Sequence, residues 1–447
     1  GVLGLARSGL AAAKLALARG ERVFASDAGD SMDAAADAIR AAGGEVETGG
    51  HSVAKLALCD VLVVSPGIPP TAGVLRDDRL RSVPRMSELE YAFQALDAPV
   101  VAVTGTNGKS TTTALAAHLL RVAGFDAPAA GNIGVALSEV ALRPNKPDWV
   151  VVEASSFQLA DVETFAPRIG VVTNLSPDHL DRYPSVERYY ADKANLFRNA
   201  TPASTWVLNG EDAAVLALAA GAAGECREFR VASPLPAGMP GGFVDDGVLV
   251  LRDAGRDHGL LPASELRLLG QHNRANALAA AVAASAAGAD ASSLARGLRS
   301  FEGLEHRLES VGEHAGVLWV NDSKATNIGS TLVALRSMTR PTVVLLGGRH
   351  KGEPYTILLP ELRRARAVVA YGEAAGIIER ELGEHLPVVR VDGGLDAVVE
   401  RTASLAQPGD VVLLSPACAS FDMFRDYEDR GRRFRALVAA RVEAIHG

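Results

Sequence analysis

The chain has 447 residues, of which 48% are hydrophobic and 22% are charged. At roughly 150 residues per domain this length predicts about three domains, and the composition is typical of a globular α/β protein. The net charge of −8 argues against a nucleic-acid partner, which needs a basic face, and no stretch is apolar enough to span a membrane. The 3 cysteines are far apart and form no disulfide or zinc pattern. We therefore expect a cytoplasmic protein.

The first section carries a glycine motif. Gly4-x-Ala6-x-x-Gly9 precedes a helix that runs through Arg19, and Asp27 follows the strand expected at 22–26. This pattern resembles a dinucleotide fingerprint with Ala for the middle glycine. Read alone, it indicates a nicotinamide-dependent oxidoreductase. However, backbone amides that face a diphosphate and an acidic residue near a ribose would suit any nucleotide diphosphate. A further strand at 60–64 and a helix at 87–96 complete the section.

A phosphate-binding loop opens the second section. The expected strand 100–104 leads into a glycine-rich turn, and a helix begins at Ser110. Backbone amides at such a turn can face a phosphate, Lys109 adds a positive charge, and the Ser110 hydroxyl can bind Mg²⁺. The spacing Gly-x-x-Gly-Lys-Ser is shorter than the usual Walker loop. The alternative is an ordinary glycine turn with a solvated lysine.

Two candidate metal ligands follow the next strands. Glu153 ends the strand expected at 149–152, and His179 lies beyond the strand expected at 168–173. Ligands gather at the carboxyl ends of parallel strands, and a carboxylate with substrate oxygens suits Mg²⁺. Imidazole is a less usual Mg²⁺ ligand, so His179 could instead orient water or substrate. Taken singly, each residue could be an ordinary polar group of a loop.

Lys193 is expected on the apolar face of a helix. Its neighbours at helical spacing are Tyr189, Tyr190, Leu196 and Phe197. One interpretation is a long side chain that extends to the surface. The other is a buried lysine whose lowered pKa leaves a neutral amine available for chemistry.

The rest of the chain continues the α/β pattern. Residues 203–269 contain short alternating runs and are expected to form an antiparallel insertion. The third section, from about residue 303, has expected strands at 317–320, 342–346, 367–370, 388–391 and 411–414.

Taken in order, the motifs of the whole chain resemble the Mur ligase family. The early motifs are shared across that family, and the last two are similar to those of its D-glutamate-adding branch. They are Thr104-Gly-Thr-Asn-Gly-Lys-Ser-Thr111, Gly131-Asn-Ile-Gly134, Glu153-Ala-Ser-Ser-Phe-Gln158, Asp178-His-Leu-Asp-Arg-Tyr183, Gly270-Gln-His-Asn-Arg-Ala-Asn276, His306-Arg307, Asn321-Asp-Ser-Lys-Ala-Thr-Asn327 and Ser415-Pro-Ala-Cys-Ala-Ser-Phe421.

The resemblance implies an α/β fold of three domains and an enzyme. Residues 1–97 would be a Rossmann-like domain that binds a UDP-linked substrate, 98–302 a central P-loop ATPase domain, and 303–447 a Rossmann-like domain that binds an amino acid. The implied monomeric ligase passes the γ-phosphoryl of ATP to the carboxylate of UDP-N-acetylmuramoyl-L-alanine, and D-glutamate then attacks the acyl phosphate. This reaction belongs to peptidoglycan precursor synthesis. The third domain would close by hinge motion at 301–303.

The resemblance also implies roles for individual residues. The UDP substrate would be held by Ser8, Asp27, Ser65, Pro66, Gly67 and Asn132. ATP would be bound by Gly105, Thr106, Asn107, Gly108, Lys109, Ser110, Thr111, Asn276, Arg307 and Asp322. The amino acid would be bound by His179, Lys324, Thr326, Lys351, Ser420, Phe421 and Tyr427. Two Mg²⁺ ions would be held by Ser110, Glu153, His179 and Lys193, the last as a carbamate formed with CO₂. The catalytic residues would be Lys109, His179 and Lys193.

Two positions depart from the family pattern, and several alternatives remain. Arg7 stands at an unexpected place in the first glycine motif, and Tyr427 replaces an expected phenylalanine. Another amino-acid-adding Mur ligase or a folylpolyglutamate synthetase-like ligase would share the central chemistry. An oxidoreductase would depend on the first glycine motif alone. A nonenzymatic ATP-binding module would have no use for Glu153, His179 and Lys193.

Overall fold

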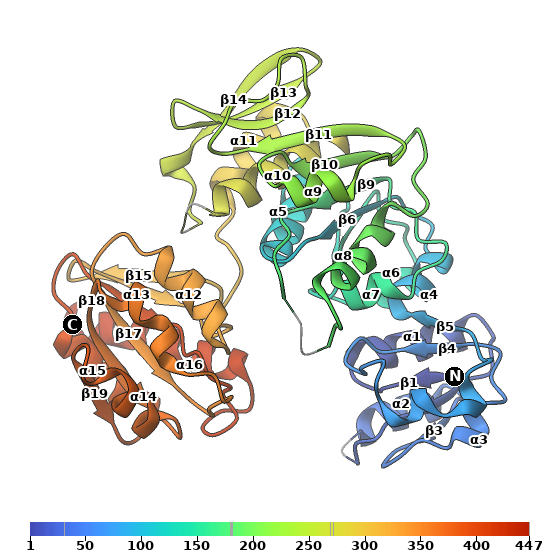
Figure 1. Cartoon of the computed structure of the whole chain (residues 1–447), viewed down its shortest axis with the longest axis horizontal. Coiled ribbons are helices and arrows are strands. Elements are labelled where there is room, and N and C mark those ends of the chain that lie inside the picture. Colours follow the sequence, from blue (N-terminus) through green and yellow to red (C-terminus); the bar gives the residue numbers. More distant parts are fainter. Residues whose placement is uncertain (31, 179–181, 269, 271, 447) are drawn as a thin grey trace. The chain divides into compact units, whose positions relative to one another are not determined.

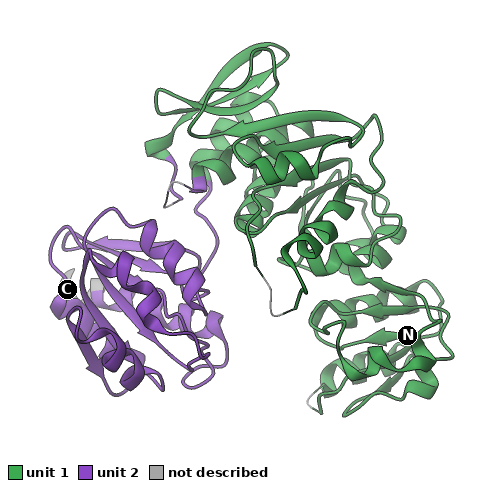
Figure 2. Ribbon diagram, viewed as in Figure 1, with its two compact units in different colours: residues 1–265, 274–300 green, residues 266–273, 301–447 purple. Residues whose placement is uncertain are grey.

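The computed structural model describes residues 1–30, 32–178, 182–268, 270 and 272–446. The chain divides into two compact units (Figure 2). Unit 1 comprises residues 1–265 and 274–300, and unit 2 comprises residues 266–273 and 301–447. Each unit is described by itself. In the described part of the chain, no helix is long and apolar enough to cross a membrane.

Unit 1 begins with a five-stranded parallel sheet in the order β3-β2-β1-β4-β5 (Figure 1). Its strands have only two or three residues each, and the longest β-branched run in this section is Val63-Val64. The elements are β1 Val2–Leu3, α1 Arg7–Ala18, β2 Phe24–Ser26, α2 Asp33–Ala41, β3 Glu45–Glu47, α3 Val53–Leu56, β4 Leu62–Val64, β5 Arg85–Ser87 and α4 Glu88–Ala95.

The second sheet of unit 1 has nine strands in the order β14-β13-β12-β11-β10-β9-β6-β8-β7. Its elements are β6 Val100–Thr104, α5 Lys109–Val122, β7 Ala129–Gly131, α6 Leu137–Ala141, β8 Val150–Glu153, α7 Ser156–Ala160, β9 Ile169–Val172, α8 Val186–Ala194, β10 Thr205–Asn209, α9 Ala213–Leu218, β11 Glu225–Arg230, β12 Gly241–Asp245, β13 Val248–Asp253, β14 Arg256–Pro262, α10 His272–Ala286 and α11 Ala291–Ser300.

The expected antiparallel insertion at 203–269 is wrong for its first half. Strands β10, β11 and β12 continue the parallel sheet from β9, and only β12, β13 and β14 pair antiparallel. The hairpin turns after β12 and β13 are local signals that the sequence carries. The pairing of β10 and β11 depends on packing contacts with other strands of the sheet. The local alternation of apolar and polar residues therefore does not predict it.

Unit 2 contains a six-stranded sheet in the order β15-β16-β20-β17-β18-β19, parallel except for the β15–β16 pair. Two buried apolar clusters include side chains of alternate residues along its central strands. The elements are β15 Glu309–His314, β16 Val317–Asn321, α12 Ile328–Arg336, β17 Thr342–Gly347, α13 Leu359–Leu362, β18 Ala365–Tyr371, α14 Ala375–Leu382, β19 Val388–Val391, α15 Leu395–Leu405, β20 Val411–Leu414 and α16 Tyr427–His446.

Helix α4 joins the two sheets of unit 1 through a buried carboxylate. Both Glu90 oxygens accept hydrogen bonds from the backbone amides of Glu163, Thr164 and Phe165, at 3.1, 2.9 and 3.0 Å. The Thr164 hydroxyl and the Gln94 amide also donate to Oε1. Burial works to raise the pKa of Glu90, but the hydrogen bonds outweigh it and hold the pKa below its ordinary value of 4.5.

We expect the substitution Glu90→Gln to lower the free energy of unfolding of unit 1 by about 1.5–3 kcal/mol, the range for hydrogen bonds to a charged group. Because the folded pKa is depressed, the carboxylate stabilises the fold above pH 4.5, and this contribution is lost as pH falls through the folded pKa. Melting curves between pH 3 and pH 8 check this. The exposed Glu45→Gln is the control, and an unchanged gap between Glu90→Gln and wild type across the range would contradict it.

Candidate functional site

The phosphate loop lies where the strand order of the large sheet reverses. Strand β6 has β9 on one side and β8 on the other, so connections on opposite sides leave a crevice at its carboxyl end. The loop from β6 into α5 occupies this edge. The carboxyl end of β8 presents Glu153, and that of β9 leads into Thr173 and Asn174. The strand–loop–helix context expected from the sequence is present.

Two glycines let the loop take its shape. Gly105 and Gly108 have φ angles of +138° and +83°, which side chains with a Cβ rarely adopt. A Cβ on Gly105 would lie 2.0 Å from the Thr173 hydroxyl, and one on Gly108 would lie 2.2 Å from Oδ1 of Asn276. Asn276 on α10 also accepts a hydrogen bond from Thr112 at 3.4 Å. The structure therefore brings Asn276 to the loop, as its expected role requires.

Two lysines meet at one carbonyl. Lys109 Nζ donates to the carbonyls of Gly105 and Thr106 at 3.0 and 2.7 Å, and Lys193 Nζ donates to Gly105 O at 2.7 Å. Lys193 is 1% exposed, so it faces inward as helix spacing predicted. Burial, followed by the charge of Lys109, lowers the pKa of Lys193 to about 6, against opposing effects of Asp178 and Glu153. At neutral pH this amine is therefore largely uncharged.

Glu153 offers an oxygen suited to a cation. Its Oε1 accepts from Asn132 Nδ2 at 2.9 Å, whereas Oε2 is buried and has no hydrogen-bond partner among the residues that the structure describes. A buried carboxylate oxygen without a donor is costly, and Mg²⁺ binds carboxylate together with substrate oxygens. Among the described residues, no three acidic, His or Cys side chains cluster as a ready-made metal site. His179, the expected second ligand, lies outside the described residues.

Arg7 acquires a structural explanation. Its Nη1 donates to Gly134 O at 2.7 Å and its Nη2 to Asn132 O at 3.4 Å. Both carbonyls belong to the turn after β7, whose Asn132 contacts Glu153 through side chain and backbone. The unexpected arginine thus links the glycine loop of the small sheet to the turn beside the candidate metal ligand.

The residues that hold the phosphate loop in place are not among those predicted from the sequence. Asn174 donates to Asn107 O and accepts from Asn107 N, both at 2.9 Å. The Thr173 hydroxyl donates to Asn107 O at 2.6 Å, and Thr106 exchanges hydrogen bonds with Ser176. The available signal was position: these polar residues follow a buried strand that neighbours the loop strand.

The small sheet gathers the residues expected to hold a UDP group. Ser8, Asp27 and Ser65 follow β1, β2 and β4, which are adjacent. Asp27 accepts from the Leu5 and Gly29 amides at 2.6 and 2.8 Å, and Ser65 donates to Gly4 O at 3.1 Å. Asp27 and Ser65 therefore order the glycine loop. Pro66 and Gly67 continue the turn after β4.

Unit 2 collects the other expected site residues at the carboxyl edge of its sheet. Lys324 lies 5.5 Å from the Tyr427 ring centroid, and Lys351 donates to Thr326 at 3.5 Å. Lys324 follows β16 and Lys351 follows β17. Ser420, which is buried, and Phe421, which is 65% exposed, follow β20. Arg307 and Asp322, which are also expected to bind ATP, belong to unit 2, whereas the phosphate loop belongs to unit 1.

Asp322 is an unusual carboxyl group. It accepts hydrogen bonds from the Ser415 hydroxyl at 2.8 Å and the Leu308 amide at 3.2 Å. Burial raises its pKa to about 7, although these donors and the charges of Arg307 and Arg430 oppose the rise. It is therefore poised between protonation states near neutral pH.

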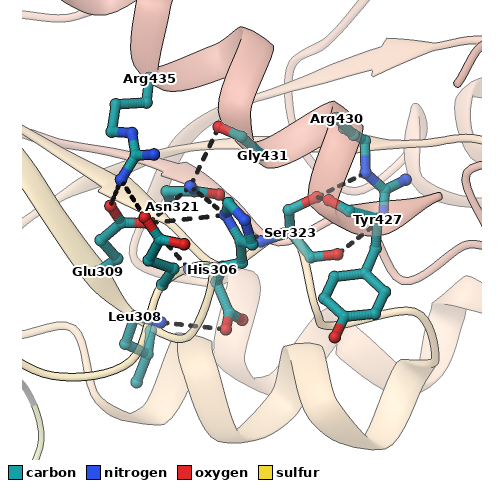
Figure 3. A network of polar contacts seen from close by, with 11 residues as sticks. His306, Leu308, Glu309, Asn321, Ser323, Tyr427, Arg430, Gly431 and Arg435 are labelled. Carbon is teal, nitrogen blue, oxygen red and sulfur yellow. Dashed lines mark hydrogen bonds and ion pairs between the residues drawn. The ribbon is translucent and has the colours of Figure 1, made fainter. Parts of the chain in front are cut away.

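Arg430 was also missed, and it organises the edge of unit 2 (Figure 3). It is fully buried on α16. Its guanidinium donates to the Ser323 hydroxyl at 2.9 Å and the Ser323 carbonyl at 2.8 Å, with longer contacts to the carbonyls of Gly347 and Cys418. One side chain therefore connects the loops that follow β16, β17 and β20.

The sequence was compared with known families and proteins. Residues 103–284 match the family described as the Mur ligase middle domain, and residues 306–418 match the Mur ligase glutamate ligase domain. The UDP-N-acetylmuramoylalanine–D-glutamate ligase of Salinibacter ruber is 45% identical over 98% of this chain and 96% of its own. The enzyme of the same name from Anaeromyxobacter dehalogenans is 43% identical with the same coverage.

Solved structures share the fold at lower identity. A UDP-N-acetylmuramate-alanine ligase from Thermotoga maritima aligns with a TM-score of 0.63 and 20% identity, over 98% of each chain. A pseudomurein peptide ligase from Methanothermus fervidus aligns with a TM-score of 0.59 and 17% identity, over 98% of this chain and 99% of its own. These two likenesses support the α/β multidomain fold.

Proposed function

Because the chain belongs to the Mur ligase family, whose members are ATP-dependent amino-acid ligases, we propose that it joins D-glutamate to UDP-N-acetylmuramoyl-L-alanine in peptidoglycan precursor synthesis. The observation that carries this substrate assignment is the identity of 45% and 43%, along nearly the whole chain, to two ligases named for that reaction. We also propose that the enzyme acts in the cytoplasm, since its precursor substrates are small and water-soluble, and that it acts as a monomer.

The proposed chemistry takes place at the phosphate loop. ATP's γ-phosphoryl passes to the L-alanyl carboxylate, ADP leaves, and the acyl phosphate is attacked by the neutral amine of D-glutamate. A tetrahedral intermediate then expels phosphate, and the amine loses a proton. In this proposal Lys109 leaves the carbonyls of Gly105 and Thr106 to offset charge on the moving phosphoryl group. Gly105 to Thr111 and Asn276 bind the nucleotide.

Mg²⁺ accompanies ATP in this family, and the donor set of the chain fits it. We propose that Oε2 of Glu153, the Ser110 hydroxyl and His179 hold the ions, at two sites. When bound, Mg²⁺ would neutralise phosphate charge. The support for Glu153 is its buried Oε2, for which the described part of the chain supplies no hydrogen-bond donor.

Lys193 is proposed to be carbamylated. Its uncharged amine would add to the carbon of CO₂, an N–H proton would leave to solvent, and a carbamate anion would remain. The pKa of about 6 supports this reaction, because only the neutral amine is nucleophilic. The product replaces a buried amine by an anion that can face a cation.

The remaining roles follow the three proposed domains, 1–97, 98–302 and 303–447. The first, Rossmann-like, would bind the UDP substrate through Ser8, Asp27, the 65–67 turn and Asn132. The last, also Rossmann-like, would bind ATP through Arg307 and Asp322. It would bind D-glutamate, with His179 of the central P-loop domain, through Lys324, Thr326, Lys351, Ser420, Phe421 and Tyr427. The boundary between the two compact units at residues 300 and 301 supports a hinge at 301–303.

The test is phosphate release from ATP with UDP-N-acetylmuramoyl-L-alanine and one amino acid at a time. We expect release with D-glutamate, in a 1:1 ratio to an amide product seen by mass spectrometry, and little with L-glutamate, L-alanine or L-lysine. Release with a different amino acid but none with D-glutamate would overturn the substrate assignment.

Arg7→Ala should raise the KM for the UDP substrate about threefold to tenfold, because the turn carrying Asn132 loses two hydrogen bonds to a charged donor. The KM for D-glutamate should stay within twofold. Steady-state kinetics check this, with the exposed Arg40→Ala on α2 as the matched control. An unchanged KM for the UDP substrate would show that the Arg7 contacts do not support binding.

A further inference from the structure

The turn His306–Leu308 in unit 2 is strained. His306 and Leu308 have φ angles of +65° and +43°, in the left-handed region that costs residues other than glycine about 1–3 kcal/mol each. A bulky leucine there is especially uncommon. The two strained residues flank Arg307. Such strain persists only where surrounding structure fixes it, and it is concentrated at functional sites.

Arg307 between them carries an unused donor. Its Nε is buried and has no hydrogen-bond partner among the described residues. A buried donor without an acceptor costs about 1–3 kcal/mol. A guanidinium matches phosphate oxygens through parallel N–H groups. The Nε–H group of Arg307 is therefore unsatisfied by the described residues alone, and an anion that reached it would supply the missing acceptor.

A buried network holds the strained turn (Figure 3). Glu309 Oε2 accepts from His306 N and from Asn321 Nδ2, both at 2.8 Å. Asn321 Nδ2 also lies 3.0 Å from His306 Nδ1 and 3.2 Å from Gly431 O. Arg435 fixes the other Glu309 oxygen at 3.1 Å. Asn321 is fully buried and His306 is 3% exposed, whereas Arg435, with a 40% exposed side chain, lies where the network meets solvent.

Helix α16 is adapted to the same turn. Gly431 lies inside this helix, where glycine costs about 1 kcal/mol relative to alanine. A Cβ at this position would lie 2.2 Å from Nδ1 of His306. Gly431 thus lowers the stability of the helix but leaves the space that the imidazole of His306 occupies. Helix stability alone gives no reason for it.

We propose that Asn321, Glu309 and Gly431 are positioning residues that hold the His306–Leu308 turn in its strained form, so that Arg307 is preset to bind a phosphate of the nucleotide. The proposal rests on the proposed function, which assigns Arg307 to ATP. In this proposal none of the three binds the nucleotide itself. They act through the backbone on either side of Arg307.

The experiment uses the full chain and two variants that keep side-chain volume, Asn321→Leu and Glu309→Gln. Calorimetry measures the Kd of Mg²⁺ with β,γ-methylene-ATP, and kinetics give the KM for ATP and for D-glutamate. We expect a rise of fivefold or more in the nucleotide Kd and in the KM for ATP, with the KM for D-glutamate within twofold. Glu313→Gln is the control, because Glu313 lies on the same strand and pairs with Arg340 at the surface.

A second measurement separates positioning from general stability. In an Arg307→Ala background, Asn321→Leu should change the nucleotide Kd by less than twofold, because the group it positions is gone. Gly431→Ala should weaken nucleotide binding although alanine favours a helix, and it replaces Asn321→Leu if that variant does not fold. Additive effects in the double variant, or a nucleotide Kd within twofold of wild type in Glu309→Gln and Gly431→Ala, would overturn the proposal.

The two proposals can fail separately. If no amino acid supports phosphate release but the Kd responds as expected, the proposed reaction is wrong and the positioning role stands. If D-glutamate is ligated and the Kd does not respond, the reaction stands and the positioning role is wrong.

Discussion

Lys193→Ala is expected to lower D-glutamate-dependent phosphate release by about 10²–10³-fold, the range for loss of one preorganised electrostatic group. The variant should keep the wild-type melting temperature within a few degrees, since burial of the Lys193 amine is itself unfavourable. Acetate or propionate should restore part of the activity by supplying the missing carboxylate. The exposed Lys14→Ala on α1 is the matched control. Wild-type activity in Lys193→Ala would rule out the carbamate.

The pH profile gives an independent check of the same group. The pKa of Lys193 is about 6, so the neutral amine needed for carbamylation is lost as pH falls through that value. We expect activity in wild type to fall below about pH 6 and to become dependent on added bicarbonate there. Degassed buffer at pH 7 should slow the enzyme, and bicarbonate should restore it. No response to bicarbonate at either pH would contradict the assignment.

Arg430→Met is expected to lower the free energy of unfolding of unit 2 by about 2–4 kcal/mol, because two short hydrogen bonds to a charged donor are lost and Ser323 O stays buried. Hydrogen exchange should accelerate in the loops after β16, β17 and β20, which Arg430 connects. Thermal denaturation and exchange mass spectrometry measure both effects.

Arg433→Met is the control for this prediction. Arg433 lies on the same helix, and its 58% exposed side chain pairs with Asp429. A surface ion pair contributes at most about 1 kcal/mol, so Arg433→Met should change little. Equal melting temperatures for the two variants would contradict the role given to Arg430.

Buried parallel strands were the elements that the sequence predicted best. The expected strands at 100–104 and 411–414 match the buried strands β6 and β20 at both ends, and the partly exposed edge strand β19 also matches the expected 388–391. Strands covered on both faces are continuous β-branched runs, which stand out from their surroundings. Strands such as β3, Glu45–Glu47, and β5, Arg85–Ser87, are short and polar. Pairing with neighbouring strands stabilises them, and their own sequence gives little indication of a strand.

The site divides in the same way. Lys193 was found because its apolar neighbours at helical spacing place it inward, and it is buried. Arg430 shares a helix face with Phe434 and Val438, which are also buried, so the same reasoning applied to α16 would have found it. Asn174, Asn321 and the Arg7 contacts could not be found in this way, because each depends on groups that are distant in sequence.

The carboxylate of Glu90 has a practical consequence for dissecting the chain. A fragment that starts at residue 98, where the expected central domain begins, would omit the acceptor for the amides of Glu163, Thr164 and Phe165. Those amides would then lie in an apolar surface left bare by α4. A fragment intended to fold as the nucleotide-binding part should therefore begin at Ser87, whose hydroxyl caps α4, although that helix was assigned to the preceding domain.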